Sequence, residues 1–396
     1  MMPKKPMASI DRPERGTIGR HSILFVATTP FAVNAFLASH LVTLSEDYRV
    51  FLCVNLEAYE LMPLVFQLVE VKHIPFVRKT APCSDLKHLL QLLILILKVK
   101  PVAIHSITPK AGLLAMMAGF VAGVPNRWHT FTGQVWATRK GLARYLLRIV
   151  DRLVVRLASQ VFADSASQCR MLCAEGIVRD GHITTLGVGS IAGVDLARFR
   201  PDSNIRELVR REIGTKATAC VFLFVGRLAR DKGIFDLVEA FQRMACVEPV
   251  AELWVVGPDE EALLSALRER ATACAAPIRW LGATSVPERY MAAADVLVLP
   301  SYREGFGSVI IEGAACGIPA VAYRIDGVAD AVVDGKSGLL VELGQLSALV
   351  ETLQTLARDS EMRLSLGKFA QERVEQEFSS RLITEAWRDY YRRQLG

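Results

Sequence analysis

Short apolar stretches of strand length alternate with longer amphipathic stretches along this chain, and this alternation restricts its fold more than any other feature. In the first half the expected strands and helices lie at His21–Ala27, Asn34–Leu44, Val50–Val54, Leu86–Lys98, Val102–Ser106, Ala111–Ala122, Arg127–Phe131 and Val161–Ala163. Alternation at these lengths is typical of parallel sheets with helices on both faces. Because the second half repeats the plan, the sequence predicts an α/β protein made of two facing Rossmann-like domains.

The length of the chain also favours two domains. A protein of 396 residues with 51% hydrophobic content can bury two cores, since a single core usually stops growing before this size. Glycines between Gly187 and Pro201 indicate a linker. We therefore expect a flexible basic tail without an export signal at residues 1–20, a first domain at 21–200, a second domain at 201–378 and a last helix at 379–396.

A glycine-rich turn in the second half lies between two acids, Glu304 and Glu312. The residues Gly305, Phe306 and Gly307 precede a helix that is expected to open near Ser308. Glycines allow an anion to approach the backbone, and the start of a helix offers unpaired N–H groups and a positive dipole end. The turn therefore predicts a diphosphate site in which one acid holds ribose hydroxyls and the other meets a sugar. The alternative is a capped helix with two solvated acids.

A second loop carries two cations. The apolar run Val221–Val225 has the length of a buried strand, and Gly226, Arg227 and Lys232 follow it before an amphipathic segment. A strand, a tight loop and a helix in this order place the loop at the carboxyl edge of a parallel sheet, where open α/β folds bind ligands. We expect Arg227 and Lys232 to face the diphosphate, with solvated surface charges as the alternative.

These motifs together resemble glycosyltransferase family four, the retaining nucleotide-sugar transferases of the GT-B fold. The resemblance extends over about residues 22–390, and its motifs are Gly226-Arg227-Leu228, Lys232-Gly233, Val256-Gly257-Pro258, Leu281-Gly282, Asp295–Ser301, the Glu304/Glu312 pair, Ala315–Val321 and Gly327–Gly338. It implies an acceptor-binding first domain, a donor-binding second domain, and a last helix that crosses back to the first. It also implies similarity to bacterial enzymes that build surface polysaccharides such as capsule or the O-antigen of lipopolysaccharide.

The activity that the resemblance implies is transfer of a hexose, expected to be N-acetylated and to come from a UDP-sugar, to a saccharide on a polyprenyl diphosphate. Arg227, Lys232 and the helix start at Ser308 would stabilise the departing diphosphate. Glu304 would orient the donor sugar, and Glu312 would bind the ribose. The alternatives are a sugar-nucleotide epimerase of the same fold and a non-catalytic sugar-nucleotide-binding scaffold. The lack of a Gly-x-Gly-x-x-Gly run after a first strand argues against a dehydrogenase.

The first domain contains two further candidates. His129, at the end of a predicted strand, is similar to the histidine that the family places near the donor sugar, but a structural role is the alternative. Lys110, at the start of a predicted helix, is expected to hold an acceptor phosphate, or else to be a solvated residue of a helix cap. Asp330 stands where the family commonly has glutamate, and we assign it no role. No metal or other cofactor is expected, because no pair of aspartates flanks a single residue.

Charge is distributed unevenly along the chain. Residues 1–200 contain 24 basic and 13 acidic side chains, whereas residues 201–396 contain 23 and 28. Arg144, Arg148, Arg152 and Arg156 recur every fourth residue beside leucines, which predicts a helix that meets anionic lipid, with an ordinary solvated helix face as the alternative. We therefore expect a cytoplasmic protein that is peripheral at the inner membrane and does not bind nucleic acid. The apolar stretch Leu89–Leu97 is too short to span a bilayer and predicts a core helix, with contact to one face of the membrane as the alternative.

Overall fold

The computed structural model describes residues 21–57, 60–76, 81–246, 251–272 and 276–396, so the predicted tail at 1–20 lies outside the described residues. Seven parallel strands form the first sheet in the order β3-β2-β1-β4-β5-β6-β7, and six form the second in the order β10-β9-β8-β11-β12-β13. The strands are β1 Ser22–Val26, β2 Arg49–Val54, β3 Glu70–His73, β4 Ala103–Ile107, β5 Asn126–Phe131, β6 Gln160–Ala163, β7 Ile183–Thr184, β8 Cys220–Val225, β9 Ala251–Val256, β10 Ile278–Gly282, β11 Val296–Leu299, β12 Ala320–Arg324 and β13 Gly338–Glu342.

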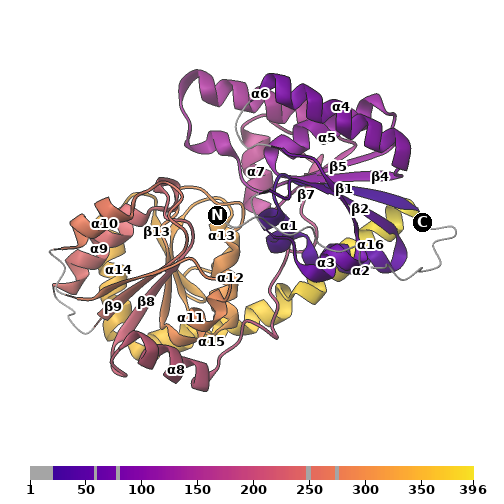
Figure 1. Cartoon of the computed structure of the whole chain (residues 1–396). Helices are drawn as coiled ribbons and strands as arrows, with labels where there is room; N and C mark the ends of the chain where they lie inside the picture. Colours follow the sequence, from indigo (N-terminus) through magenta and orange to yellow (C-terminus); the bar gives the residue numbers. More distant parts are fainter. Residues whose placement is uncertain (1–20, 58–59, 77–80, 247–250, 273–275) are drawn as a thin grey trace, which may run out of the picture.

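Helices cover both faces of each sheet (Figure 1). They are α1 Pro30–Phe36, α2 Ala38–Asp47, α3 Pro63–Leu68, α4 Pro82–Val99, α5 Pro109–Val121, α6 Gly141–Leu157, α7 Ala166–Ala174, α8 Ser203–Ile213, α9 Ile234–Ala245, α10 Leu264–Ala271, α11 Pro287–Ala293, α12 Ser308–Ala315, α13 Val328–Ala331, α14 Leu346–Arg358, α15 Ser360–Glu377 and α16 Ser380–Leu395. The strand order reverses beside β1 and beside β8, and ligands of open α/β sheets bind at the carboxyl ends of the strands at such a point.

The central strands are apolar because both of their faces are covered. Phe25 of β1 lies in register with Leu52 of β2 on one side and with His105 of β4 on the other. All three side chains are at most 1% exposed. Continuous burial of this kind explains why the strands appear as apolar runs without alternation.

The last helix, α16, packs against α2 of the first domain, as the resemblance implies. Arg388 and Arg392 both bind the carboxylate of Asp47, with N–O distances of 2.7 to 3.0 Å. Hydrogen bonds from the two guanidinium groups hold the pKa of Asp47 well below its usual range. Trp387 stacks on His40 with 4.2 Å between ring centroids, so charge and aromatic packing together attach the end of the chain to the first domain.

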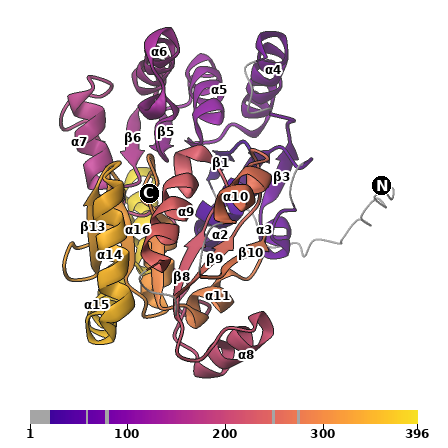
Figure 2. The ribbon, with the colours of Figure 1, turned by 90° about the vertical axis from the view of Figure 1, so that its left-hand side faces the viewer.

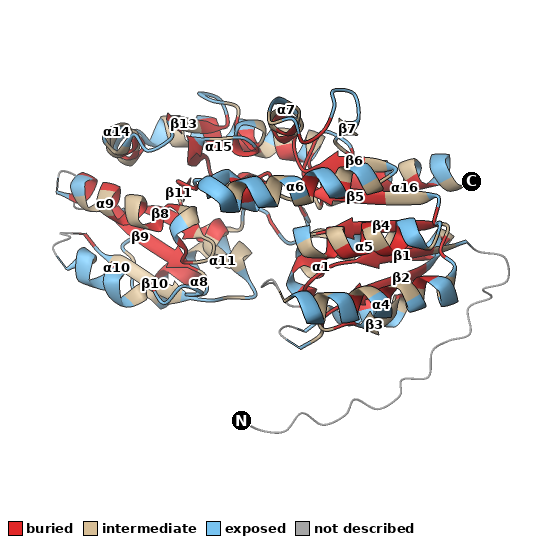
Figure 3. Ribbon diagram, turned by 90° about the horizontal axis from the view of Figure 1, so that it is seen from above, coloured by how far each residue is buried: buried red, intermediate tan, exposed pale blue. Residues whose placement is uncertain are grey.

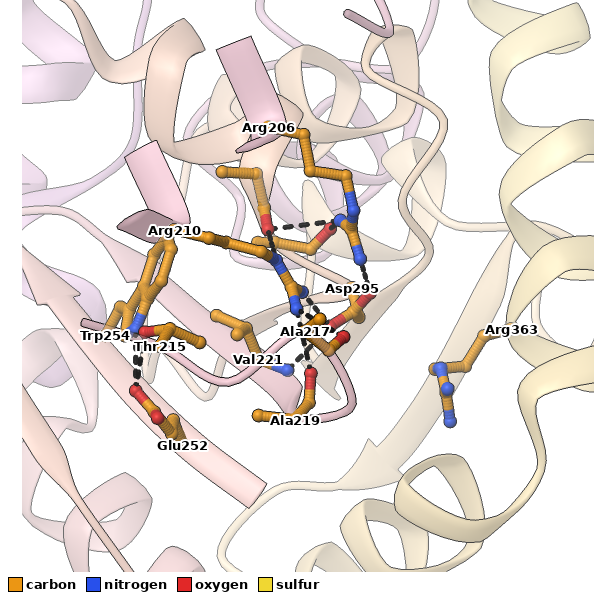
Figure 4. A network of polar contacts seen from close by, with 12 residues as sticks. Arg206, Arg210, Thr215, Ala217, Ala219, Val221, Glu252, Trp254, Asp295 and Arg363 are labelled. Atoms are coloured by element: carbon orange, nitrogen blue, oxygen red, sulfur yellow. Dashed lines mark hydrogen bonds and ion pairs between the residues drawn. The ribbon is translucent and has the colours of Figure 1, made fainter. Parts of the chain in front are cut away.

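A network of charged groups supports the amino edge of the second sheet (Figure 4). Arg206 and Arg210 of α8 each bind one oxygen of Asp295 at 2.6 Å. Asp295 also accepts the Val221 N–H at 2.7 Å, at the start of β8. Because removal of one partner would leave a charge that is mostly buried, Asp295 stabilises the domain from the edge opposite the ligand-binding ends.

Helix α4 differs from the predicted core helix. Only His88, Leu92 and Ile96 are buried, whereas Leu86, Leu90, Ile94 and Leu97 are more than half exposed. The reason is its position in an outer layer beside α5, where only one side of the helix meets the protein (Figures 2 and 3). None of the helices within the described residues combines the length and hydropathy needed to cross a membrane.

Several predicted boundaries were also wrong. The predicted helix at Asn34–Leu44 is divided into α1 and α2 around Leu37, and α4 begins at Pro82 instead of at Leu86. The carboxylate of Asp85 accepts the Ala81 N–H at 3.2 Å, so Asp85 caps the helix from inside its first turn. The short strands β3 and β7 were not predicted, because neither contains an apolar run of strand length.

Candidate active site

The turn between β11 and α12 has the predicted form. Gly307 adopts a left-handed conformation with φ of 79°, and α12 begins at the next residue, Ser308. Phe306 is 1% exposed, and its ring centroid lies 5.3 Å from that of Phe378. The turn is therefore held by a buried ring while its backbone stays at the carboxyl edge of the sheet, beside the first N–H groups of α12.

Lys232 and Glu304 meet across two neighbouring loops. Lys232 Nζ lies 2.6 Å from Glu304 Oε1, and the Ser301 hydroxyl donates to the same oxygen at 2.8 Å. Gly233 allows this approach, because its φ is 66° and a Cβ there would lie 1.8 Å from the carbonyl oxygen of Pro300. The prediction that Lys232 lies at the glycine-rich turn agrees with this geometry, but its binding to Glu304 was not predicted.

Arg227 lies in the loop after β8 and is surrounded by acids. Its guanidinium binds Glu260 at 3.1 Å and lies 3.8 Å from Asp231. Asp231 also binds Arg303 at 2.7 Å, and although burial acts in the opposite direction, the Arg303 contact holds the pKa of Asp231 below its usual range. Sequence reasoning missed Asp231, Glu260 and Arg303, because none of them stands in a motif that it recognised.

Gly226 begins this loop, and its backbone lies against Gly257 after the neighbouring strand β9. A Cβ on Gly257 would lie 1.7 Å from the Gly226 carbonyl oxygen. The close backbone contact fixes the direction in which the loop with Arg227 leaves the sheet.

Glu312 lies one turn into α12, as the spacing predicts. Burial raises the pKa of this carboxyl to about 7, although the nearby Arg198 guanidinium acts in the opposite direction. Arg198 in turn binds Glu288 at 2.8 Å. Glu312 is therefore able both to donate and to accept a hydrogen bond near neutral pH.

His129 is buried in β5. Its Nδ1 lies 2.9 Å from the Ser106 hydroxyl, and burial lowers its pKa to about 3, so the ring is neutral at pH 7. Gly112 of α5 packs directly on the ring, since a Cβ there would lie 2.4 Å from it. The end of the same strand reaches the second domain, where a Cβ on Gly133 would lie 3.2 Å from the Gly305 nitrogen.

The start of α7 forms a second contact between the domains that sequence reasoning missed. Ser165 donates to the Gly305 carbonyl at 3.0 Å, and Ser167 binds the carboxylate of Asp330 at 2.6 Å. Asp164, just before them, is 3% exposed, and burial raises its pKa to about 7. The available signal was the polar run that follows the predicted strand at Val161–Ala163.

Lys110 binds an acid of the first domain. Its Nζ lies 2.6 Å from Asp85, and both side chains are more than four-fifths buried, so this ion pair joins α5 to α4. At the same sheet edge the hydroxyls of Thr28 and Thr108 are 2.6 Å apart. Binding of an acceptor phosphate by Lys110 stays a prediction.

Three of the four arginines that were predicted to face lipid have partners within the protein, and their contact with lipid stays a prediction. Arg144 and Arg148 bind Glu175 at 2.7 and 3.2 Å, and Arg152 donates to the Gly176 carbonyl at 3.0 Å. The guanidinium groups of Arg144 and Arg148 also lie over the Trp136 ring. The fourth, Arg156, is exposed.

The outward side of α6 is apolar. Leu142, Tyr145, Leu146, Ile149 and Leu153 are 38 to 71% exposed. The predicted helix is therefore present, and its outer surface combines these apolar side chains with the exposed Arg152 and Arg156.

Taken together, the second domain presents Arg227, Lys232 and the N–H groups of α12 on one sheet edge, a set that can neutralise a diphosphate. Glu304 and Glu312 flank this set and can accept hydrogen bonds from hydroxyls. Within the residues that the structure describes, no three His, Cys, Asp or Glu side chains are grouped so as to hold a metal ion. Independence from metal stays a prediction.

Comparison with known proteins agrees with this geometry. Residues 205–373 match the family of glycosyl transferases group 1, and residues 33–189 match the glycosyl transferase 4-like domain. The chain is 31% identical over 331 residues to the capsular polysaccharide biosynthesis glycosyltransferase CapM of Staphylococcus aureus, with 81% of this chain and 85% of CapM aligned. It is 29% identical over 194 residues to the lipopolysaccharide core biosynthesis glycosyltransferase LpsE of Rhizobium meliloti, covering 48% of this chain and 55% of LpsE.

Solved structures confirm the predicted fold. The structure of Anabaena HepE in complex with UDP and glucose superposes with a TM-score of 0.76 over 93% of this chain and 99% of HepE, at 19% sequence identity. WaaG, a glycosyltransferase involved in lipopolysaccharide biosynthesis, superposes with a TM-score of 0.71 over 92% of this chain and 98% of WaaG, at 16% identity.

Proposed function

This chain belongs to the group 1 glycosyltransferases with the GT-B fold, and from this premise we propose that it transfers a hexose from a UDP-sugar to a lipid-linked saccharide during the synthesis of a surface polysaccharide. The main observation that supports the proposal is the ion pair between Lys232 and Glu304 beside the start of α12. A cation and a sugar-binding acid adjoin the backbone donors that a diphosphate needs.

Cleavage of the anomeric bond places negative charge on the departing diphosphate. Fixed cations and oriented N–H groups stabilise this charge more in the transition state than in the ground state, which lowers the barrier. We assign this role to Arg227, Lys232 and the N–H groups of α12. These groups provide the charge that a metal ion supplies in other transferases, and we therefore propose metal-independent transfer.

Glu304 is assigned to the donor sugar and Glu312 to the ribose. The acceptor hydroxyl would attack from the face that the diphosphate leaves, so the anomeric configuration would be retained. Buried and neutral, His129 would serve as a hydrogen-bonding residue near the sugar and not as a cation. The choice of UDP is supported by the fold shared with HepE, which binds UDP, and an N-acetylated hexose is the specific donor that we propose.

Similarity to CapM, a capsular polysaccharide enzyme, and to LpsE, a lipopolysaccharide core enzyme, supports an acceptor of the capsule or lipopolysaccharide class. Such acceptors grow on lipid carriers, so the protein would work at the cytoplasmic face of the inner membrane. The exposed leucines of α4 and α6 offer a surface for this contact. Both helices pack against α5 and lie on the same face of the first domain (Figures 1 and 2).

A panel of nucleotide sugars tests the proposal. A donor at about 100 times its dissociation constant stabilises the folded protein by about 2.7 kcal/mol, which a thermal shift detects. We expect UDP-N-acetylhexoses to give the largest shift and to be hydrolysed slowly without acceptor, in the presence of EDTA, with the released sugar first appearing in the donor's anomeric configuration. A larger shift with GDP- or ADP-sugars would overturn the choice of UDP, and an epimerised sugar nucleotide as the product would replace transfer by epimerisation.

A further inference from the structure

The start of α7 in the first domain binds two loops of the second domain. The Ser165 hydroxyl donates to the Gly305 carbonyl at 3.0 Å. The Ser167 hydroxyl donates to Asp330 Oδ2 at 2.6 Å and accepts the Gly327 N–H at 2.6 Å. The Ser167 N–H donates to the same carboxylate oxygen at 2.7 Å. We call Ser165, Ser167 and Asp330 the interdomain latch.

The backbone at the latch is packed too closely for side chains. A Cβ on Gly327 would lie 2.4 Å from the Gly305 carbonyl oxygen. A Cβ on Gly305 would lie 2.7 Å from the Thr132 carbonyl oxygen and 2.9 Å from Asp164 Oδ2, both in the first domain. The residue that follows Glu304 is therefore enclosed by the first domain on one side and by Gly327 on the other.

We propose that Ser165, Ser167 and Asp330 are positioning residues for glycosyl transfer, which fix the Glu304–Ser308 turn from the opposite domain. The latch touches Gly305 and Gly327 and leaves the Lys232–Glu304 pair free to meet the donor. Glu304 takes its working geometry toward the donor sugar only when the domains are closed on each other. Orientation of the donor sugar and domain closure are thereby connected through one backbone carbonyl.

Arg227 does not depend on this contact, because Glu260 of its own domain holds it. Lys232 also binds an acid of its own domain, but this acid is Glu304, which begins the latched turn. Helix α13, which contains Asp330, is also held within that domain, because Arg373 donates to the carbonyls of Asp330 and Ala331 at 2.9 and 3.0 Å. Removal of the Asp330 carboxylate should therefore open the latch without unfolding α13.

The inference rests on the proposed function only for its turnover readout, so the test begins with a measurement that needs no substrate. Amide hydrogen exchange of the peptide 304–312 is compared between wild type, Ser167→Ala, Asp330→Ala and the double variant. The matched control is Asp334→Ala, which removes an aspartate bound by Arg324 within the second domain. We expect exchange in the two single variants to be on the order of tenfold faster, because hydrogen bonds to a charged group are among the stronger ones.

The effects of Ser167→Ala and Asp330→Ala on amide exchange should not add. The double variant should exchange no faster than the faster single variant, because each change breaks the same contact. Hydrolysis of UDP-N-acetylglucosamine should fall about ten- to a hundredfold in all three, while UDP affinity measured by calorimetry changes by less than about threefold. Wild-type exchange in both folded single variants, or effects that add in the double variant, would overturn the latch. If the variants exchanged faster as expected but wild type did not bind UDP, the latch would stand and the proposed donor would be overturned.

Discussion

Lys232 Nζ binds Glu304 Oε1 at 2.6 Å, although the two residues belong to the loops that follow β8 and β11. The pair is more than four-fifths buried, so each charge depends on the other when no donor is present. In the proposed reaction, a diphosphate that enters the site would offer Lys232 a new anionic partner and release Glu304 to accept hydroxyls of the donor sugar. The ion pair would thus prepare both residues for the roles that we propose.

Replacement of the cation should affect both turnover and stability. Lys232→Ala removes charge that stabilises the leaving group, so we expect turnover to fall on the order of a hundredfold or more. It also leaves Glu304 without its cation, so the melting temperature should fall. Arg227→Ala, at a more exposed ion pair, should lose similar activity with a smaller loss of stability. Steady-state kinetics and thermal unfolding measure the two effects, with Arg243→Ala on the exposed surface of α9 as control.

Substitution of Glu312 should affect UDP affinity, whereas substitution of Glu304 should affect turnover. Glu312→Gln should weaken UDP binding about ten- to a hundredfold, because the charged hydrogen bond to the ribose is lost. Since burial raises the pKa of Glu312 to about 7, this loss should be greater at pH 8, where the wild-type group is ionised, than at pH 6. Glu304→Gln should lower turnover and leave UDP affinity nearly unchanged. Calorimetry at both pH values would contradict the ribose role if the Glu312 variant bound UDP as wild type does.

The turn between β11 and α12 was predictable because its features come from residues that are adjacent in the sequence. The glycines, the helix start at Ser308 and the position of Glu312 one turn later follow from a few adjacent residues. The loop with Arg227 and Lys232 was predictable for the same reason, since an apolar strand directly precedes it. By contrast, Ser167 and Asp330 are 163 residues apart and belong to different domains. Their contact depends on how the domains face each other, which no local pattern encodes.

The surface of α6 could also be predicted only in part. The sequence predicts the helix and its arginine spacing, but contacts with other segments determine which side chains of the helix face solvent. Glu175 at the end of α7 and the Trp136 ring hold Arg144 and Arg148 against the protein, so the leucines face outward. Charge patterning alone could not indicate this orientation, because both partners come from other segments of the chain.

Gly233 should tolerate no side chain. Gly233→Ala would place a Cβ 1.8 Å from the Pro300 carbonyl oxygen at a φ of 66°, so we expect a loss of stability together with a loss of activity at the adjacent Lys232. Gly214→Ala is the matched control, because its φ is 77° and no atom lies within 4 Å of the added Cβ. The control should cost only the left-handed strain of about 1–2 kcal/mol. Equal urea midpoints for the two variants would contradict the close approach.

Asp164 and Glu312 should contribute stability that declines as pH rises through the weakly acidic range, whereas buried neutral histidines such as His129 contribute in the opposite direction. Burial raises the pKa of Asp164 and of Glu312 to about 7, from ordinary values of 3.8 and 4.5. Between about pH 4.5 and pH 7 the unfolded chain holds both groups ionised while the folded protein holds them protonated. Unfolding then releases protons from these two groups, so their contribution to the free energy of unfolding falls with rising pH and levels off above pH 7. Urea unfolding from pH 5 to pH 8 measures the slope.

Asp164→Asn should remove the contribution of Asp164, so the free energy of unfolding should fall less, or rise more, with increasing pH than it does in wild type. Asp389→Asn, at an exposed position on α16, should keep the wild-type slope. A slope that is the same in all three proteins would show that Asp164 is ionised in the folded state over the whole range.

Membrane binding should depend on the outward leucines of α4 and α6. Full transfer of one leucine from water contributes about 1.5–3 kcal/mol, so replacing Leu90, Ile94, Leu142 and Leu146 with serine should release the protein from phosphatidylglycerol vesicles at any salt concentration. The double variant Arg144→Gln, Arg148→Gln should instead have a lower melting temperature, because both arginines bind Glu175. It should weaken vesicle binding less than the serine variant does. Co-sedimentation separates the cases: equal pelleting of wild type and the serine variant would exclude the leucine surface, and release by the arginine variant alone would restore the arginines as the lipid contact.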